Sequence, residues 1–252
     1  MDSGSRQQKI VEFARSRGRV EVIALAQELG VSTETVRRDL NLLSNRRLVK
    51  RVHGGAIPRE TVAFESGLDH RSQHDAEQKH RIAAAAVAEL HGAETVYLDE
   101  GYTPRLIAEL LVDHPITVVT SSLWAAQALA HSSTVTVLLL GGRMRGRTLA
   151  TVDHWALEML RSLVIDVAFL GTNAISVEHS CTTSDPAVAA VKATALKVSR
   201  RTVLVAAESK FGESDFCRFA EVRDLDTIVT GVELDPASAR QYELLGPRVV
   251  RS

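Results

Sequence analysis

The sequence has 252 residues and a net charge of −1, from 30 Lys and Arg residues against 31 Asp and Glu residues. Apolar residues make up 45% and charged residues 24%, a composition typical of folded proteins that argues against disorder over the whole length. No aliphatic stretch approaches the roughly 20 residues that span a bilayer, and the first residues contain no apolar signal core. We therefore expect a soluble, intracellular protein without a membrane partner.

The charge is unevenly distributed along the chain. Residues 1–60 contain 12 Lys and Arg against 7 Asp and Glu, a net charge of +5, whereas residues 61–252 carry −6. The balance of the whole chain argues against a protein that coats nucleic acid. A small basic head joined to a larger acidic body indicates two separate functions.

Cysteines and histidines show no disulfide or metal-binding pattern. Cys181 and Cys217 have no CxxC spacing, and we interpret them as small core or loop residues. His70 and His74 could share a helical face, but no further Cys or carboxylate completes a set of ligands. We predict neither a metal nor a cofactor.

The basic head predicts three short helices. Apolar residues at helical spacing indicate helices over residues 8–17 and 22–29, with Gly18 and Gly30 at their ends. Ser32 is a suitable N-cap for a third helix. The apolar positions of that helix repeat at spacings of four and three: Val36, Leu40 and Leu43.

This order of helix, Gly turn and Ser-capped helix is that of a helix-turn-helix unit, whose second helix enters the DNA major groove. Short donors and an arginine pair lie where base edges and phosphates would be: Ser32, Thr33, Thr35, Arg37 and Arg38. The alternation that follows, ending in Gly54 and Gly55, predicts a hairpin wing that carries Lys50, Arg51 and His53. The alternative is a solvated basic helix on an ordinary small domain. The order of the parts favours DNA binding.

These residues resemble the DeoR family of bacterial transcriptional regulators. The family signature is V-S-x-x-T-[IV]-R-[RK]-D-L-x-x-L, followed by an R-x-H-G-G-A wing. Residues 31–43 read VSTETVRRDLNLL and residues 51–56 read RVHGGA. We interpret Asp39 as a structural partner of a nearby arginine. The resemblance implies double-stranded operator DNA as a partner and a cytoplasmic protein, nucleoid-associated when bound to DNA.

The acidic body alternates strands and helices. We expect a winged helix-turn-helix domain over residues 1–57, a polar linker over 58–76 and a sensor domain over 77–252, opening with a helix to about His91. Predicted strands are 95–98, 116–120, 134–140, 166–170, 202–206 and 227–230, and predicted helices are 104–111, 123–130, 153–163, 186–199 and 236–245. Strands rich in Val, Ile and Leu between helices predict a Rossmann-like α/β fold, with a mostly parallel sheet covered on both faces.

Polar residues follow successive predicted strands, and such sheets bind ligands beyond the carboxyl ends of their strands. The candidates are Asp99, Gly101, Tyr102, Thr103, Thr120, Ser121, Ser122, Gly141, Gly142, Arg143, Gly171, Asn173, Asp185, Lys192 and Lys210. Carboxylates and amides suit sugar hydroxyls, whereas cations and helix starts, such as one that Thr103 would cap, suit a phosphate. Lys192 falls inside a helix and could equally be a surface residue.

These loops resemble the DeoR sensor domain, which is similar to ribose-5-phosphate isomerase. The family strings L-D-x-G-[ST]-T, T-N-S, F-[LIV]-G-x-N-G and S-K-[FY]-G appear here as LDEGYT, TSS, FLGTNA and SKFG. Tyr102 replaces a small hydroxyl residue, Ser121 an Asn, Ala174 a Gly and Val188 a Glu. Tyr102 would crowd a phosphate or stack on a sugar, which leaves the identity of the effector open.

The resemblance implies a homodimeric or homotetrameric regulator, a repressor of carbohydrate or polyol catabolism genes, that responds to a sugar or sugar-phosphate effector and is not an enzyme. The alternative is a sugar-phosphate isomerase-like enzyme with a DNA-binding appendage. Its candidate acid–base groups are Asp99, Asp185, Glu208, Lys192 and Lys210. Val188 in place of Glu removes one such group, and catalysis would not explain the head.

Overall fold

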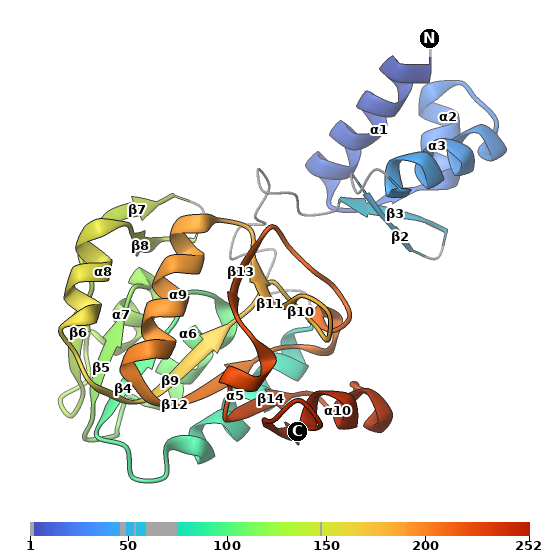
Figure 1. Cartoon of the computed structure of the whole chain (residues 1–252). Helices are drawn as coiled ribbons and strands as arrows, with labels where there is room; N and C mark the ends of the chain where they lie inside the picture. Colours follow the sequence, from blue (N-terminus) through green and yellow to red (C-terminus); the bar gives the residue numbers. More distant parts are fainter. Residues whose placement is uncertain (1–2, 46–48, 53, 59–74, 147) are drawn as a thin grey trace. The chain divides into compact units, whose positions relative to one another are not determined.

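The computed structural model describes residues 3–45, 49–52, 54–58, 75–146 and 148–252 (Figure 1). The chain divides into two compact units, Met1–Glu65 and Ser66–Ser252, which we call the head and the sensor unit. The predicted linker lies almost entirely outside the described residues, as does His53 of the predicted wing. No helix within the described ranges is both long and apolar enough to cross a membrane.

The head is a winged helix-turn-helix. Its elements in chain order are α1 (Ser3–Arg17), β1 (Val20–Glu21), α2 (Val22–Leu29), α3 (Thr33–Asn45), β2 (Val49–Val52) and β3 (Gly55–Pro58). The strands form an antiparallel sheet in the order β1-β3-β2. The apolar triplet of α3, with Val36 and Leu40 fully buried, packs in one core with α1 and α2. The three helices and the hairpin predicted from the sequence are confirmed.

The turn between α2 and α3 follows the predicted local chemistry. Gly30 adopts a left-handed conformation with φ of 64°, which a side chain would disfavour. The Thr35 amide donates to the Ser32 hydroxyl at 3.1 Å, so Ser32 caps the start of α3.

Asp39 of α3 forms hydrogen bonds with two side chains of α1. Its buried carboxylate accepts hydrogen bonds from the Arg6 guanidinium at 2.6 Å and the Gln7 amide at 2.9 Å. The structural role predicted for Asp39 is confirmed. This carboxylate fixes α3 against α1.

The sensor unit contains a seven-stranded, fully parallel sheet in the order β15-β14-β12-β9-β4-β5-β6. The strands are β4 (Thr95–Leu98), β5 (Thr117–Thr120), β6 (Thr136–Leu139), β9 (Ile165–Gly171), β12 (Ser199–Val205), β14 (Thr227–Thr230) and β15 (Arg248–Arg251). The predicted parallel α/β class is confirmed.

Helices cover both faces of the sheet (Figure 1). One apolar cluster joins the strands to α5 (Ala76–Val87), α6 (Tyr102–Leu110) and α7 (Leu123–Leu129). The other joins them to α8 (His154–Arg161), α9 (Pro186–Val198) and α10 (Pro236–Glu243). Burial on both faces explains the continuous aliphatic runs of the central strands.

Several short strands were not predicted. They are β7 (Arg143–Arg145), β8 (Ala150–Val152), β10 (Ala174–Ser176), β11 (Ser180–Thr183), β13 (Cys217–Ala220) and the edge strand β15. β7 and β8 form a hairpin, and β10, β11 and β13 form a small antiparallel sheet. Unlike β6 and β12, these segments contain no run of three or more Val, Ile and Leu residues that would mark them in the sequence.

Both cysteines are free, as expected. Cys181 is buried in the sensor core, and burial raises the pKa of its thiol to about 12. Within the described ranges no group of three or more His, Cys, Asp or Glu side chains could hold a metal ion, and His70 and His74 lie outside those ranges.

Replacing Asp39 by Ala should destabilise the head by about 3 kcal/mol, because it removes the carboxylate that accepts from the partly buried Arg6 guanidinium and the buried Gln7 amide. Thermal unfolding followed by far-UV circular dichroism should show the loss. Both tryptophans, Trp124 and Trp155, belong to the sensor unit, so their fluorescence transition should not move.

The matched control is Glu28→Ala, which removes an exposed ion pair with Arg17 in the same unit. It should cost less than about 1 kcal/mol. Equal losses from the two substitutions would contradict the structural role of Asp39.

Candidate functional site

The first candidate site is the outer face of α3 in the head. The side chains of Thr33, Arg37 and Arg38 are exposed. The Ser32 hydroxyl caps the start of α3 by accepting from the Thr35 amide, and it lies 2.9 Å from the Thr35 hydroxyl, so both hydroxyls are engaged with each other. The two guanidinium groups are therefore the strongest donors that this face presents to a nucleic acid.

The wing carries a second set of cations. Lys50 on β2 is exposed. Arg51 is half-buried, and its Nη1 atom is buried with no hydrogen-bond acceptor among the described residues. Lys50 is thus better presented to a ligand than Arg51.

The second candidate site is a cavity in the sensor unit, beyond the carboxyl ends of β4, β9 and β12. β4 and β9 are neighbours, yet the chain runs from β4 out to β5 and β6 before it returns to β9. The strand order therefore reverses between β4 and β9, where open α/β sheets bind their ligands. The cavity is lined by Lys79, Glu100, Gly101, Tyr102, Thr103, Pro104, Gly171, Thr172, Asn173, Lys192, Val205, Ala206, Ala207 and Lys210.

The structure brings part of the predicted effector set together. The predicted residues that line the cavity are Gly101, Tyr102, Thr103, Gly171, Asn173, Lys192 and Lys210. Asp99 lies directly behind them, bonded to two of these residues. Their role in binding an effector remains a prediction.

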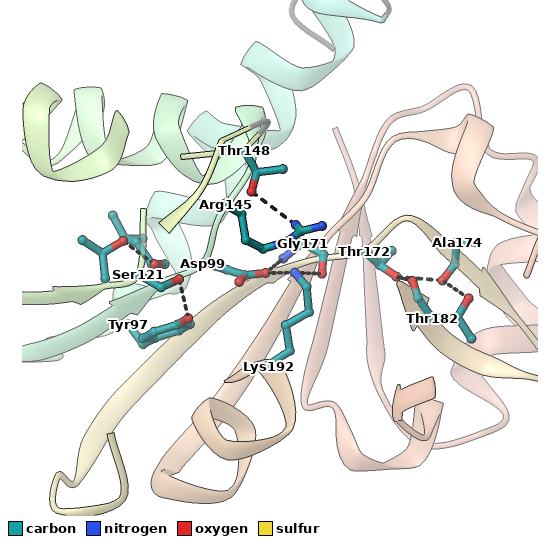
Figure 2. A network of polar contacts seen from close by, with 12 residues as sticks. Tyr97, Asp99, Ser121, Arg145, Thr148, Gly171, Thr172, Ala174, Thr182 and Lys192 are labelled. Carbon is teal, nitrogen blue, oxygen red and sulfur yellow. Dashed lines mark hydrogen bonds and ion pairs between the residues drawn. The ribbon is translucent and has the colours of Figure 1, made fainter. Parts of the chain in front are cut away.

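Lys192, which lines the cavity, forms a buried ion pair with Asp99 (Figure 2). Asp99 Oδ2 accepts from the Lys192 ammonium and from the Gly171 amide at 2.9 Å. Lys192 Nζ also donates to the Gly171 carbonyl at 3.1 Å. Both side chains are 1% exposed, so the reading of Lys192 as a surface residue is wrong. Oδ1 of Asp99 is buried and has no donor among the described residues.

The start of α6 forms another wall. Gly101 has a φ of 124°, which lets the chain turn directly into the helix at Tyr102. The expected N-cap role of Thr103 is wrong, because Thr103 is already the second residue of α6 and no side chain caps the helix. The positive end of the helix dipole therefore faces the cavity without a capping hydroxyl or carboxylate.

Lysine side chains come to the cavity from three different elements. Lys79 lies on α5, Lys192 on α9 and Lys210 in the 3-10 turn Glu208–Lys210 after β12. The Lys79 ammonium is 5.9 Å from the centre of the Tyr102 ring, close enough for a cation–π contact. Glu100 adds one carboxylate to the lining. The site thus combines cations, a helix start and an aromatic ring.

The predicted loop after β5 lies outside the cavity. Thr120, Ser121 and Ser122 are each at most 1% exposed. The β7–β8 hairpin covers them, with the Thr151 amide donating to the Ser121 carbonyl at 2.8 Å. Ser122 caps α7 through the Ala125 amide. These hydroxyls serve local structure, which the sequence could not reveal because the covering hairpin was not predicted.

The Ser121 hydroxyl lies 3.2 Å from the Tyr97 hydroxyl inside the sheet (Figure 2). Burial, with the negative charge of Asp99, raises the pKa of Tyr97 well above its ordinary value. The phenol therefore stays protonated and available as a donor. Ser121 completes this buried pair of hydroxyls beneath the hairpin.

The remaining predicted residues also lie away from the cavity lining. Gly141 and Gly142 connect β6 to β7, and the exposed Arg143 pairs with Asp153 at 2.6 Å. Asp185 caps α9 through two backbone amides and pairs with Arg145 at 3.3 Å. Asp185 thus has a structural explanation that needs no ligand.

Comparison with known families decides the class of protein. Residues 6–62 match the DeoR-like helix-turn-helix domain, and residues 74–232 match the DeoR C terminal sensor domain. The chain belongs to the DeoR family. The two matched segments correspond to the head and to most of the sensor unit, so this DeoR protein is a transcriptional regulator.

Relatives of this DeoR protein match it over nearly its whole length. The HTH-type transcriptional regulator GlpR of Haloferax volcanii is 35% identical, over 97% of this chain and 96% of the relative. The glycerol-3-phosphate regulon repressor and the L-fucose operon activator of Haemophilus influenzae are each 30% identical. These alignments cover 92% and 94% of this chain and 90% and 95% of the relatives.

Among solved structures, ribose 5-phosphate isomerase A from Methanocaldococcus jannaschii is similar over 54% of this chain and 55% of that chain. The TM-score is 0.40 and the sequence identity is 15%. A similarity of this extent supports no argument about activity.

Three polar residues that line the cavity were not among the effector-binding residues predicted from the sequence: Lys79, Glu100 and Thr172. Glu100 and Thr172 directly follow predicted site residues, so their position in the loops was a usable signal. Lys79 gave no such signal. It reaches the cavity because α5 is bonded to the loop after β12, where the Glu208 amide donates to Gln78 and Ser209 donates to Asp75.

Lys192→Met should destabilise the sensor unit by about 3–5 kcal/mol, because it leaves the Asp99 carboxylate buried without its cation. Urea unfolding followed by tryptophan fluorescence measures this loss. The double variant Asp99→Asn/Lys192→Met should lose clearly less than the sum of the single losses.

Arg143→Met is the matched control, since it breaks an exposed ion pair in the same unit. It should cost less than about 1 kcal/mol. Additive losses for Asp99 and Lys192 would show that the pair contributes no mutual stabilisation.

Proposed function

We propose that this DeoR regulator represses carbohydrate or polyol catabolism genes, and that a phosphorylated sugar or polyol bound in the sensor cavity releases it from its operator. The observation that carries the proposal is the cavity itself, where Lys79, Lys192 and Lys210 surround an uncapped helix start. Cations and free helix amides are the groups that bind phosphate.

Polar groups next to the cations suit the rest of such a ligand. Asn173 donates its side-chain nitrogen to Asp215, and the Thr172 hydroxyl donates to backbone carbonyls, so both offer a ligand their oxygens as acceptors. Glu100 offers a carboxylate for sugar or polyol hydroxyls. Tyr102 adds a flat apolar face against which a carbon chain would pack. The names of two relatives, a glycerol-3-phosphate regulon repressor and an L-fucose operon activator, support this class of effector.

We propose that the protein acts in the cytoplasm as a homodimer or homotetramer. Paired helix-turn-helix units read half-sites about 10 bp apart or a multiple of that distance. The effector must bind one arrangement of the heads more tightly than the other, because a ligand shifts an equilibrium only through its differential affinity.

We propose further that the cavity is not catalytic. Asp99 and Lys192, two of the candidate acid–base groups, are buried and bonded to each other. Val188, at the position of the usual Glu, is a buried apolar residue of α9. Turnover of a sugar-phosphate panel tests this directly, and robust isomerisation would refute a purely regulatory role.

Replacing both Arg37 and Arg38 by Ala should weaken operator binding at least about 30-fold, since each loses contacts worth roughly 1–3 kcal/mol. Electrophoretic mobility shift with the promoter region of the protein's own operon measures the effect. Effector-induced thermal stabilisation should be unchanged.

Arg17→Ala serves as the control, because it removes the same charge from α1 of the same unit. Its effect on operator affinity should be several-fold at most. Retained affinity in the Arg37/Arg38 double variant would exclude α3 as the recognition helix.

Lys210→Gln and Lys79→Gln should each weaken effector binding by about 10-fold or more while leaving operator binding intact. A thermal-shift screen of sugars, polyols and their phosphates first identifies the ligand, and titration then gives its affinity. Lys197→Gln, an exposed position on α9 outside the cavity lining, is the control. Unchanged affinity in both cavity variants would place the effector elsewhere. Asp99 is a poor choice for this test because its replacement also breaks the buried ion pair.

A further inference from the structure

The start of α5 has the sequence of a capped helix without the capping contacts. Residues 75–78 read DAEQ, with an aspartate three positions before a glutamine. In such a capping box the first side chain accepts from a backbone amide of the first turn, and the second reaches back to the amide of the first residue. Asp75 occupies the N-cap position of α5, yet its side chain makes no capping hydrogen bond.

The backbone of Asp75 accounts for the missing cap. Its φ of 56° and ψ of 34° are left-handed, whereas a capping residue is usually extended. Other aspartates of the sensor unit follow the same rule. Asp185 and Asp235 are extended, and each accepts from two amides of the helix that follows. Asp153, with a φ of 75°, makes no capping hydrogen bond with α8.

The two side chains bind the loop after β12 instead. The Ser209 hydroxyl donates to the Asp75 carboxylate at 2.8 Å, and the Glu208 amide donates to the Gln78 side-chain oxygen at 3.1 Å. The Gln78 side-chain nitrogen donates to Glu233 at 2.6 Å. Residues with the sequence of a cap for α5 thus hold the 3-10 turn after β12 against the helix. We call this the loop-bound arrangement.

A capped arrangement of the same residues is the physical alternative. In it Asp75 would be extended, its carboxylate would accept from the first turn of α5, and Gln78 would turn back to the Asp75 amide. The loop-bound arrangement has its hydrogen bonds to the loop but keeps a non-glycine residue left-handed, which is unfavourable unless surrounding contacts impose it. The terms that favour each arrangement are of similar size, so a modest difference in ligand contacts can select between them.

The loop-bound arrangement places two lysines together at the cavity. Lys79 follows Gln78 on α5, Lys210 follows Ser209 in the loop, and both line the cavity. An anionic ligand that contacts both ammonium groups holds the loop against α5. Because a ligand favours the arrangement to which it binds more tightly, such a ligand favours the loop-bound arrangement.

Asp75 also lies close to the connection between the two units of the chain. α5 is the first described element of the sensor unit, and residues 59–74 connect it to β3 of the head. The φ and ψ angles of Asp75 set the direction in which the chain enters α5. A change from left-handed to extended backbone therefore redirects the chain at the connection to the head.

We propose that Asp75 and Gln78 form a two-state switch, in which the loop-bound arrangement disfavours operator binding and the capped arrangement favours it. The direction of the switch rests on the proposed function, because the proposed effector binds at Lys79 and Lys210 and releases the operator. The two arrangements themselves are inferred from the backbone and the hydrogen bonds of Asp75 and Gln78.

Two substitutions at one position test the switch in the full-length protein. Asp75→Val and Asp75→Gly both remove the carboxylate, but glycine adopts the left-handed conformation freely, whereas a β-branched residue is a clear outlier there. Hydrogen exchange at the Glu208 amide should be at least about 5-fold faster in Asp75→Val, because Gln78 no longer accepts from it. Operator affinity, measured by mobility shift without added ligand, should be at least about 5-fold tighter in Asp75→Val than in Asp75→Gly.

Ser209→Ala is a second variant, since it removes one hydrogen bond of the loop-bound arrangement and leaves Asp75 able to cap. Relative to wild type it should shift exchange and operator affinity in the same direction as Asp75→Val. Asp235→Val and Asp235→Gly are the matched controls, at the extended N-cap of α10. These two variants should not differ from each other in either quantity.

Circular dichroism verifies that each variant is folded, and Ser209→Ala against wild type decides the question if Asp75→Val does not fold. Equal exchange at Glu208 in the two Asp75 variants, or operator affinities that are equal or in the reverse order, would overturn the proposal. The exchange comparison uses the free protein. A wild-type protein whose operator binding no sugar phosphate changes would refute the proposed function, and the exchange comparison would still decide whether the two arrangements exist.

Discussion

The buried ion pair between Asp99 and Lys192 is the constraint on which the sensor unit depends. Removing two charges from water is costly, and their attraction offsets this only when the geometry is good and the remaining polar groups are bonded. The Gly171 backbone meets part of that requirement, donating to Oδ2 of the carboxylate and accepting from the ammonium, whereas the buried Oδ1 has no donor among the described residues. The pair thereby joins the ends of β4 and β9 at the position where the strand order reverses.

This pair also determines what the cavity offers a ligand. Much of the Lys192 charge is already neutralised by Asp99, so Lys192 contributes structure as much as attraction. Lys79 and Lys210 bring their charge from α5 and from the loop after β12. The anion recognition that we propose for this cavity is thus spread over elements that are far apart in the sequence.

The sequence was sufficient to predict the main helices and six of the seven strands of the parallel sheet, because these elements depend on local pattern. Continuous Val, Ile and Leu runs indicate strands that are buried on both faces, and Gly30 and Ser32 mark a helix end and start through their own chemistry. The signature of α3 also separates its faces, with Arg37 and Arg38 exposed beside a buried Asp39.

The candidate site was predicted only in part because burial depends on tertiary contacts. A hydroxyl after a strand looks the same whether it faces a ligand or a covering hairpin, and Thr120 through Ser122 proved to be covered. Lys192 looked like any helical lysine until its carboxylate partner, distant in the sequence, was placed beside it. The cavity residue Lys79 carried no local signal at all.

The β7–β8 hairpin divides the carboxyl edge of the sheet into two regions. The ends of β5 and β6 are sealed, with the Thr151 hydroxyl donating to the Leu140 carbonyl beneath the hairpin, whereas the ends of β4, β9 and β12 stay open. Loops around the open ends can therefore vary in sequence without disturbing the packing of the sealed half. Variation in these loops would change the effector site that we propose while the remainder of the sheet keeps its shape.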